Sequence, residues 1–221
     1  MADRNSIQVK ICGMRDISLA LDVLHWGADF IGMIHHVRSP RHVSLTEMTS
    51  LSSNLPEGTR VAVVVDPEPM LVRAIWQTGV DHLQVHLKNG SEQRLEQLQK
   101  SVPPGKQLWL APSLPPECVF PSEILPFASR VVVDTYVPHQ VGGTGKTGDW
   151  SGFRKLATAN PMMPFVLAGG LHPENVCEAI RVSGATCIDV NSGVEREPGV
   201  KCPEKIRALF QALHEQCSDV P

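Results

Sequence analysis

A cysteine stands where the first apolar stretch of the chain ends. Residues 9–12 have the period-two pattern of a strand that stops on Cys12, and Gly13 predicts a sharp turn into a helix. The carboxyl end of a strand is the position most used for chemistry in parallel α/β folds. A buried cysteine is more often only a small hydrophobic side chain. Cys12 alone therefore does not indicate a reactive site, and the other strand ends of the chain decide between the two interpretations.

An aspartate follows a second apolar stretch. Three valines at positions 131–133 predict a buried strand, and Asp134 comes directly after them. At the mouth of a barrel such a carboxyl group is a candidate general acid or base. The alternative is a turn or helix cap, because aspartate commonly begins loops.

Three glycine-bearing loops follow later strands. Glycine lets backbone N–H groups approach an anion, and one loop leads into a predicted helix start at Pro173, where the helix dipole favours negative charge. A single glycine pair is usually only a turn, but loops at two consecutive strand ends predict a phosphate site. The candidate residues are Gly142, Gly143, Gly145, Gly169, Gly170, Asn191, Ser192 and Gly193. Residues 136–149 are long enough for a lid, with a surface loop as the alternative.

Alternating strands and helices must position these groups. A capping-box pattern at Ser44 and Glu47 predicts one helix start, and Asp66 followed by Pro67 predicts another. The alternation without a composition break predicts an α/β protein with a single-domain (β/α)8 TIM barrel over residues 1–221, and a doubly wound open sheet is the alternative. The predicted strands are residues 7–12, 28–34, 61–65, 81–85, 107–111, 130–134, 164–168 and 185–190.

Composition narrows the class of partner. A net charge of -3 without a basic stripe argues against nucleic acid and anionic membranes and favours a small-molecule partner. The first residues are polar, and no apolar stretch is long enough to span a membrane, so we expect a cytoplasmic protein. The six cysteines lack CxxC pairs and zinc-type spacing, so we expect reduced thiols and no metal site.

Together these motifs resemble the phosphoribosylanthranilate isomerase family, whose members catalyse an aldose-to-ketose isomerisation in tryptophan biosynthesis. The resemblance covers nearly the whole chain. It depends on Lys10-Ile11-Cys12-Gly13, Ser39-Pro40-Arg41, Gln84-x-His86, Val133-Asp134-Thr135, Gly142-Gly143-Thr144-Gly145-Lys146, Asp149-Trp150, Leu167-Ala168-Gly169-Gly170-Leu171-x-Pro173-x-Asn175-Val176 and Asp189-Val190-Asn191-Ser192-Gly193-Val194-Glu195.

The resemblance implies an Amadori rearrangement of N-(5'-phosphoribosyl)anthranilate without a cofactor. By position, Cys12 matches the general base of the family and Asp134 its general acid. Arg41 matches the arginine that contacts the anthranilate carboxylate, and a guanidinium suits a planar carboxylate because it bonds both oxygens. His86 and Lys10 are further substrate-binding candidates, and the phosphosugar substrate is the only implied partner. The sequence leaves the oligomeric state open.

Lys10 has a predicted partner. It shares the parity of Cys12 on the first strand, while Asp189 lies on the eighth strand, which a closed barrel places beside the first. We therefore expect a Lys10–Asp189 ion pair beneath the site that keeps positive charge near the thiol. A purely structural ion pair is the alternative.

The match weakens at three strand ends, all expected to face the aromatic part of the substrate. His35-His36 replaces an aromatic pair, Leu87 replaces a glycine, and Trp109-Leu110-Ala111-Pro112 replaces a Lys-Ala ending. One alternative is a family paralogue that isomerises a different N-phosphoribosyl or amino-sugar phosphate. Another is a catalytically silent phosphate-ligand binding protein. A metal-dependent pentose-phosphate epimerase is disfavoured, because it needs His and Asp ligands at several strand ends.

Overall fold

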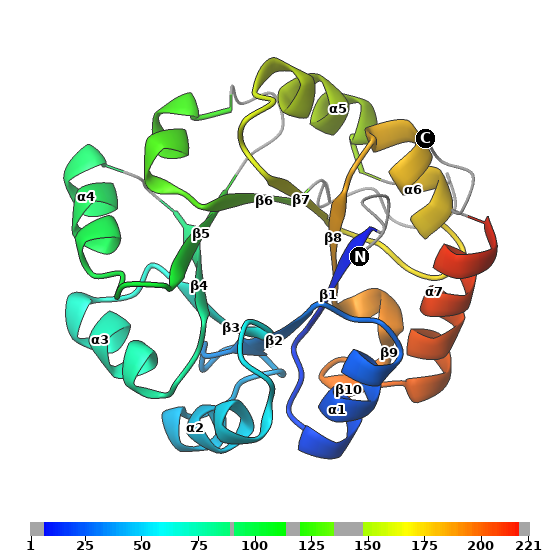
Figure 1. The fold of residues 1–221 in the computed structure, drawn as a ribbon, viewed down its shortest axis with the longest axis horizontal. Coiled ribbons are helices and arrows are strands. Elements are labelled where there is room, and N and C mark those ends of the chain that lie inside the picture. The colour runs from blue at the N-terminus through cyan, green and yellow to red at the C-terminus, as the bar shows by residue number, and fades with distance from the viewer. Residues whose placement is uncertain (1–6, 89–90, 114–119, 135–147, 217–221) are drawn as a thin grey trace.

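The eight predicted strands form a closed parallel barrel in the computed structural model, which describes residues 7–88, 91–113, 120–134 and 148–216. Each strand pairs with the next, and β8 pairs with β1, so that the two ends of the sheet meet (Figure 1). This closure excludes the doubly wound alternative. The strands are β1 (Gln8–Cys12), β2 (Phe30–Ile34), β3 (Arg60–Val65), β4 (His82–Leu87), β5 (Gln107–Pro112), β6 (Arg130–Asp134), β7 (Phe165–Ala168) and β8 (Cys187–Val190).

Helices form a ring outside the barrel (Figure 1). Between β5 and β6 the connection is the short 3-10 helix η1, because the proline-rich sequence there disfavours a regular α-helix. The helices are α1 (Ile17–His25), α2 (Leu45–Asn54), α3 (Pro69–Gln77), α4 (Glu92–Lys100), η1 (Ser122–Phe127), α5 (Trp150–Ala159), α6 (Val176–Ser183), η2 (Ser192–Val194) and α7 (Pro203–Gln216).

Local capping explains where α2 begins, whereas the start of α3 corrects one prediction. The capping box of Ser44 and Glu47 is present at α2, as predicted. The predicted helix start at Asp66 is wrong, because α3 begins at Pro69 with Glu68 as its N-cap. Asp66 has a φ of +43°, so the chain turns there before it enters the helix.

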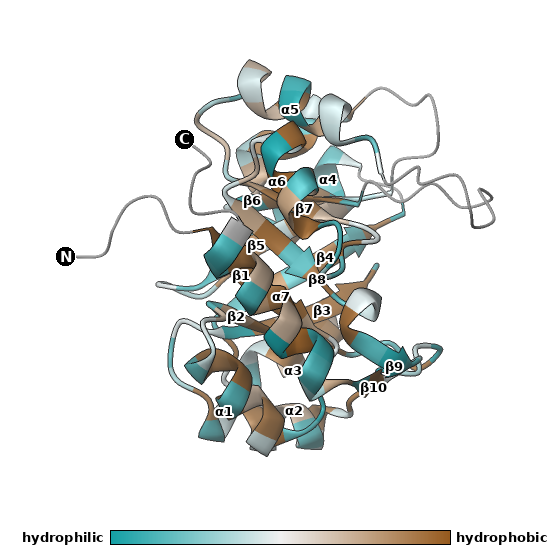
Figure 2. Ribbon diagram, turned by 90° about the vertical axis from the view of Figure 1, so that its right-hand side faces the viewer, coloured by the Kyte–Doolittle hydropathy of each residue, from teal (hydrophilic) through white to brown (hydrophobic). Residues whose placement is uncertain are grey.

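Alternation along the strands separates two apolar layers. Outward-facing side chains such as Ile11 and Val64 pack with the helices in the larger core. Figure 2 shows apolar colour along the strands, whereas the helices combine apolar and polar residues. The second layer fills the barrel interior and consists of Cys12, Phe30, Val61, Val63, Trp109, Ala111, Val132, Val166, Ala168 and Cys187.

An antiparallel hairpin follows β8 and η2 and was not predicted. Its strands are β9 (Glu195–Glu197) and β10 (Val200–Lys201), and it extends from one end of the barrel (Figure 2). Gly199 in the turn has a φ of +87°, a conformation that favours glycine. The hairpin carries Glu195 and Lys201 back toward the loop that follows β2.

The structure corrects one prediction about the cysteines. Cys177 on α6 is disulfide-bonded, so the expectation that all six cysteines are reduced is wrong. Cysteine spacing in the sequence did not show this bond, because pairing depends on which elements the fold brings together.

Within the described residues, no helix is both long and apolar enough to cross a membrane.

Candidate active site

A cavity of about 350 Å³ opens at the carboxyl ends of the strands. It brings together Cys12 from the end of β1 and Asp134 from the end of β6. The lining residues are Cys12, Ile34, Arg41, Val63, Gln84, His86, Val132, Asp134, Ala168, Gly169, Gly170, Leu171, Asp189, Asn191 and Ser192. Gly142, Gly143 and Gly145 lie outside the described residues, as does most of the predicted lid segment.

The thiol of Cys12 is buried, and charges of both signs lie near it. Burial and the Asp189 carboxylate raise the pKa of Cys12, while the ammonium groups of Lys10 and Lys201 act to lower it. Gly32 stands opposite Cys12 in the register of β1 and β2, and a Cβ there would lie 2.8 Å from the sulfur. Gly32 therefore makes room for the thiol, a role that its position within an apolar strand did not reveal.

Lys10 lies fully buried below the cavity and forms the predicted ion pair. Its ammonium group donates to Asp189 Oδ2 at 2.7 Å and to Gln84 Oε1 at 2.8 Å. Burial alone would lower the pKa of Lys10, but Asp189 and Cys12 outweigh it and the pKa is raised. Lys10 therefore stays charged, and it contributes positive charge beside the thiol.

Gln84 carries this hydrogen-bond chain on to His86. An ammonium group only donates, so Gln84 Oε1 accepts from Lys10, and Gln84 Nε2 must then donate to His86 Nε2 at 3.0 Å. His86 Nε2 is thus the acceptor, and the ring proton belongs on Nδ1. Burial, followed by the charge of Lys10, lowers the pKa of His86 to about 4, so the imidazole that lines the cavity is neutral near pH 7.

Asp134 approaches the cavity from the other side. Its carboxylate is exposed at the end of β6, and its backbone pairs in register with Ala168 of β7. Val132 faces the barrel interior two residues earlier, so the period of the strand turns Asp134 toward the same interior. A thiol and a carboxyl group therefore line one cavity from different strands.

The glycine loop after β7 adopts a conformation that glycine favours. Gly169 and Gly170 have φ values of +96° and +63°. Asn175 at the start of α6 donates through Nδ2 to the Gly170 carbonyl oxygen at 2.9 Å, which fixes the loop against the helix. Gly193 has a different task, because a Cβ there would lie 1.9 Å from the Leu171 carbonyl oxygen. Gly193 thus lets the two loops pack together.

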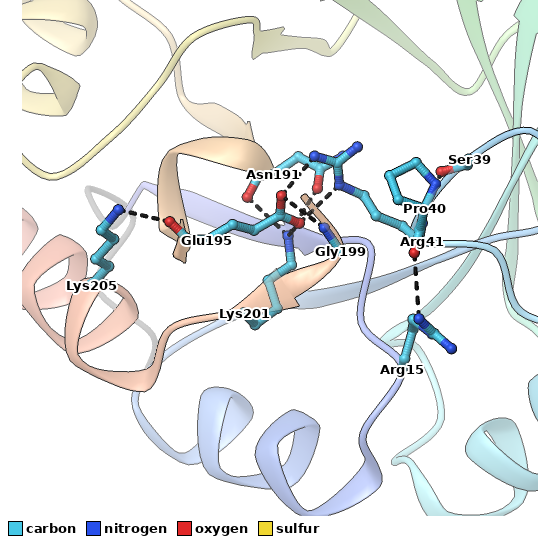
Figure 3. Close-up of polar contacts among 9 residues, drawn as sticks. All are labelled: Arg15, Ser39, Pro40, Arg41, Asn191, Glu195, Gly199, Lys201 and Lys205. Atoms are coloured by element: carbon cyan, nitrogen blue, oxygen red, sulfur yellow. Dashed lines mark hydrogen bonds and ion pairs between the residues drawn. The ribbon is translucent and has the colours of Figure 1, made fainter. Parts of the chain in front are cut away.

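Arg41 lines the cavity but is also engaged by an acidic residue. Its guanidinium donates from Nε to Glu195 Oε1 at 2.8 Å and from Nη2 to Glu195 Oε2 at 2.6 Å (Figure 3). No pattern in the sequence pairs Arg41 with Glu195. Glu195 lies in one of the quoted motifs, but its place in a hairpin beyond β8 gave no sign of its partner.

The side chains at the three family departures do not line the cavity. Leu87 faces outward into the core between strands and helices, so the expectation that it faces the substrate is wrong. The His35 ring contacts the Val43 carbonyl oxygen through Nδ1 at 2.8 Å and packs 4.9 Å from the ring of His42. Ala111 lies in the barrel interior, and none of these side chains lines the cavity. His36 is close enough to His86 to contribute to lowering its pKa.

The fold and the site define a TIM-barrel enzyme whose reactive groups stand at the carboxyl ends of the strands beside glycine loops suited to an anion. The model of the N-(5'-phosphoribosyl)anthranilate isomerase family matches residues 9–212. The chain belongs to this isomerase family.

Relatives and solved structures agree over nearly the full length. The N-(5'-phosphoribosyl)anthranilate isomerase of Nitrosospira multiformis is 36% identical over 210 residues, covering 94% of this chain and 97% of that protein. The crystal structure of the enzyme from Thermotoga maritima has a TM-score of 0.78 at 28% identity, covering 94% of this chain and 98% of the other. A phosphoribosyl anthranilate isomerase in complex with reduced 1-(o-carboxyphenylamino)-1-deoxyribulose 5-phosphate has a TM-score of 0.74 at 26% identity, with the same two coverages.

Proposed function

We propose that this protein isomerises N-(5'-phosphoribosyl)anthranilate to 1-(2-carboxyphenylamino)-1-deoxyribulose 5-phosphate, a step of tryptophan biosynthesis. The observation that carries the proposal is the single cavity in which Cys12, Asp134, Arg41 and two glycine loops meet, in a chain of this family. Glycine loops at the ends of β7 and β8 suit the phosphate, and Arg41 suits the carboxylate on the aromatic ring.

Asp134 is the proposed general acid for ring opening. Its carboxyl group donates a proton to the ring oxygen while the bond between that oxygen and C1' breaks, and the nitrogen lone pair forms a double bond to C1'. This step requires Asp134 to hold a proton when the substrate is bound. Its place at the cavity, across the barrel from Cys12, supports the role.

Cys12 is the proposed general base. Its thiolate removes the proton from C2', the electron pair of that bond forms the double bond between C1' and C2', and the nitrogen recovers its lone pair. Protonation of C1' and loss of the enol proton then give the ketose. The atoms balance without an oxidant or reductant, so Cys12 and Asp134 together account for the rearrangement and no cofactor is proposed.

The proposal is tested with phosphoribosylanthranilate formed in the cuvette from anthranilate and phosphoribosyl pyrophosphate, by following the decay of its fluorescence. Wild-type protein should turn it over, while Cys12→Ala and Asp134→Asn should each lose at least about a hundredfold in kcat. Cys187→Ala is the matched control, because Cys187 is also a buried thiol of the barrel interior but does not line the cavity.

Each outcome decides between defined alternatives. Activity that survives in both variants contradicts the assigned acid and base. No turnover by folded wild-type protein that still binds a phosphosugar favours a paralogue with another substrate or a silent binding protein. A loss in Cys187→Ala as large as in Cys12→Ala would assign the effect to packing of the barrel interior.

A further inference from the structure

The hairpin after β8 supports Arg41 with a buried carboxylate. Glu195 accepts two hydrogen bonds from the guanidinium edge that carries Nε and Nη2 (Figure 3), and Arg41 also lines the cavity. Within the described residues, the hydrogen bonds of the Arg41 guanidinium use Nε and Nη2 and leave Nη1 for another partner. A guanidinium held along one edge has a fixed plane, so the direction in which its remaining edge donates is also fixed.

Glu195 itself has no capacity left for a ligand. Its Oε1 accepts from Arg41 and from Lys201, and its Oε2 accepts from Arg41 and from the Gly199 N–H at 3.3 Å. Burial acts to raise the pKa of Glu195, but Arg41 and Lys201 outweigh it and lower the pKa to about 2. Glu195 therefore stays ionised and serves as an anchor for the cations around it.

Lys201 gives this group an excess of positive charge. Its ammonium lies buried and donates to Glu195 Oε1 and to both the carbonyl and side-chain oxygens of Asn191, each at 2.8 Å. Arg41 and Glu195 alone would form a neutral pair with little attraction for an anion. With Lys201 the group has two positive charges and one negative charge, so one positive charge remains beside the cavity.

We propose that Glu195 and Lys201 are positioning residues for the aromatic carboxylate of the substrate, and both act through Arg41. Glu195 fixes the plane of the guanidinium. Lys201 supplies the charge that leaves Arg41 attractive to an anion despite its acidic partner. The inference rests on the proposed function, since it assigns these residues to the part of the substrate that carries the carboxylate.

The test measures how much the carboxylate contributes to binding. Two probes are titrated calorimetrically: reduced 1-(o-carboxyphenylamino)-1-deoxyribulose 5-phosphate and the same compound with phenyl in place of carboxyphenyl. The ratio of their two Kd values is the carboxylate preference. Binding is the right readout because Lys201 also lowers the pKa of Cys12, so a change in kcat would mix two effects.

Lys201→Met should reduce the carboxylate preference about tenfold, as expected for losing one charge that supports a carboxylate contact, while the phenyl probe binds within about threefold of wild type. Lys201→Arg should restore most of the preference, because the charge returns. Glu195→Gln should reduce the preference by less than Lys201→Met, since an amide offers only one acceptor oxygen to the two guanidinium donors but also removes the negative charge that opposes Arg41.

Lys205→Met is the matched control. Lys205 donates to the backbone carbonyl oxygen of Glu195 at 2.7 Å, so it touches the same segment without touching the carboxylate (Figure 3). Its loss should leave the carboxylate preference unchanged. If Lys201→Met fails to fold, Lys201→Arg and Glu195→Gln still test the inference through the same ratio.

The inference is overturned if both probes weaken equally in Lys201→Met and Glu195→Gln, because that pattern belongs to a merely structural role. It is also overturned if the preference survives in both variants. Failure of the proposed function has a different signature: wild-type protein would then show no turnover of phosphoribosylanthranilate and no carboxylate preference at all.

Discussion

Two buried carboxylates flank the cavity, and they are satisfied to different degrees. Asp189 in the barrel interior binds Lys10 through Oδ2, while its Oδ1 is buried without a hydrogen bond among the described residues. Glu195 at the rim uses both oxygens, each for two donors. In the rim network of Arg41, Glu195 and Lys201, the carboxylate is therefore fully hydrogen-bonded. The inner network, which consists of Lys10, Asp189, Gln84 and His86, keeps one strong acceptor, Asp189 Oδ1, next to the cavity.

This difference indicates different tasks. A buried carboxylate oxygen without a partner is costly, and such sites usually serve a ligand or a mechanism. Asp189 lines the cavity, so we expect a hydroxyl group of a sugar ligand to donate to Oδ1. Both oxygens of Glu195 are already hydrogen-bonded, so Glu195 acts on the ligand only through Arg41 and Lys201.

The charge balance differs as well. Lys10 and Asp189 neutralise each other deep in the barrel, and the neutral Gln84 and His86 extend the network without adding charge. At the rim, Arg41 and Lys201 share one carboxylate. Removal of a cation should therefore harm the inner network more, because no second cation remains to neutralise Asp189 there.

The largest expected effect is on folding stability in Lys10→Met. This change leaves Asp189 buried without its counter-charge and should lower the free energy of unfolding by about 3–5 kcal/mol, as is usual when one partner of a buried ion pair is removed. Lys201→Met should cost clearly less, because Arg41 still neutralises Glu195. Urea denaturation of the two variants beside wild type measures both values.

Equal losses in the two lysine variants would break the comparison, since they would mean that Arg41 does not compensate at the rim. The double variant Lys10→Met with Asp189→Leu is the control. Because it removes both charges, it should recover part of the stability that Lys10→Met alone loses.

The inner network was the more predictable from sequence. Lys10 shares a strand face with Cys12, and barrel closure alone places β8 beside β1, so the pair with Asp189 follows from parity and topology. Gln84 and His86 share a face for the same reason. The period of a strand is a local property, and it determined the inner half of the site.

The rim was not predictable in the same way. Glu195 reaches Arg41 only because the chain after β8 turns back as a hairpin instead of entering α7 directly. Loop geometry depends on many tertiary contacts and has no simple period. Leu87 is a different case: it looked like a substrate contact as a motif departure, but the strand parity that turns His86 inward turns Leu87 outward.

A second, smaller effect concerns pH. The pKa of His86 is lowered to about 4 in the folded protein from an ordinary value of 6.5, so the unfolded chain binds the extra proton first as pH falls. Stability should be constant above pH 6.5 and fall between pH 6.5 and 4, by about 3 kcal/mol at most from this residue. The pKa of Glu195 is also lowered, from 4.5 to about 2, but for a carboxyl group this shift favours the charged form. Glu195 therefore loses its contribution to folding stability only as pH falls below 4.5.

The decisive measurement is the difference in unfolding free energy between wild type and His86→Gln from pH 7 to 4.5. All other ionisable groups are the same in the two proteins, so their effects cancel in this difference. A wild-type decline that His86→Gln abolishes would assign acid sensitivity to the inner network. An identical decline in both proteins would show that His86 is not held neutral by its surroundings.

The smallest expected effect tests how tightly the hairpin packs on the loop that carries Arg41. A Cβ at Gly199 would lie 2.5 Å from the Pro40 carbonyl oxygen, whereas a Cβ at Gly58 would have nothing within 4 Å, and the two φ values are +87° and +86°. Gly58→Ala should therefore cost only the strain of a positive φ, about 1–2 kcal/mol. Gly199→Ala should cost that strain plus the displacement of the hairpin from Pro40.

The comparison becomes sharper when ligand binding is measured on the same two variants. Displacement of the hairpin moves Glu195, so Gly199→Ala should also weaken binding of the reduced carboxyphenylamino-deoxyribulose phosphate, while Gly58→Ala should not. Equal stability losses with unchanged binding would mean that the hairpin shifts without moving Arg41. In that case the orientation of the guanidinium would depend on the loop that carries Arg41, and the hairpin would not be a rigid support for it.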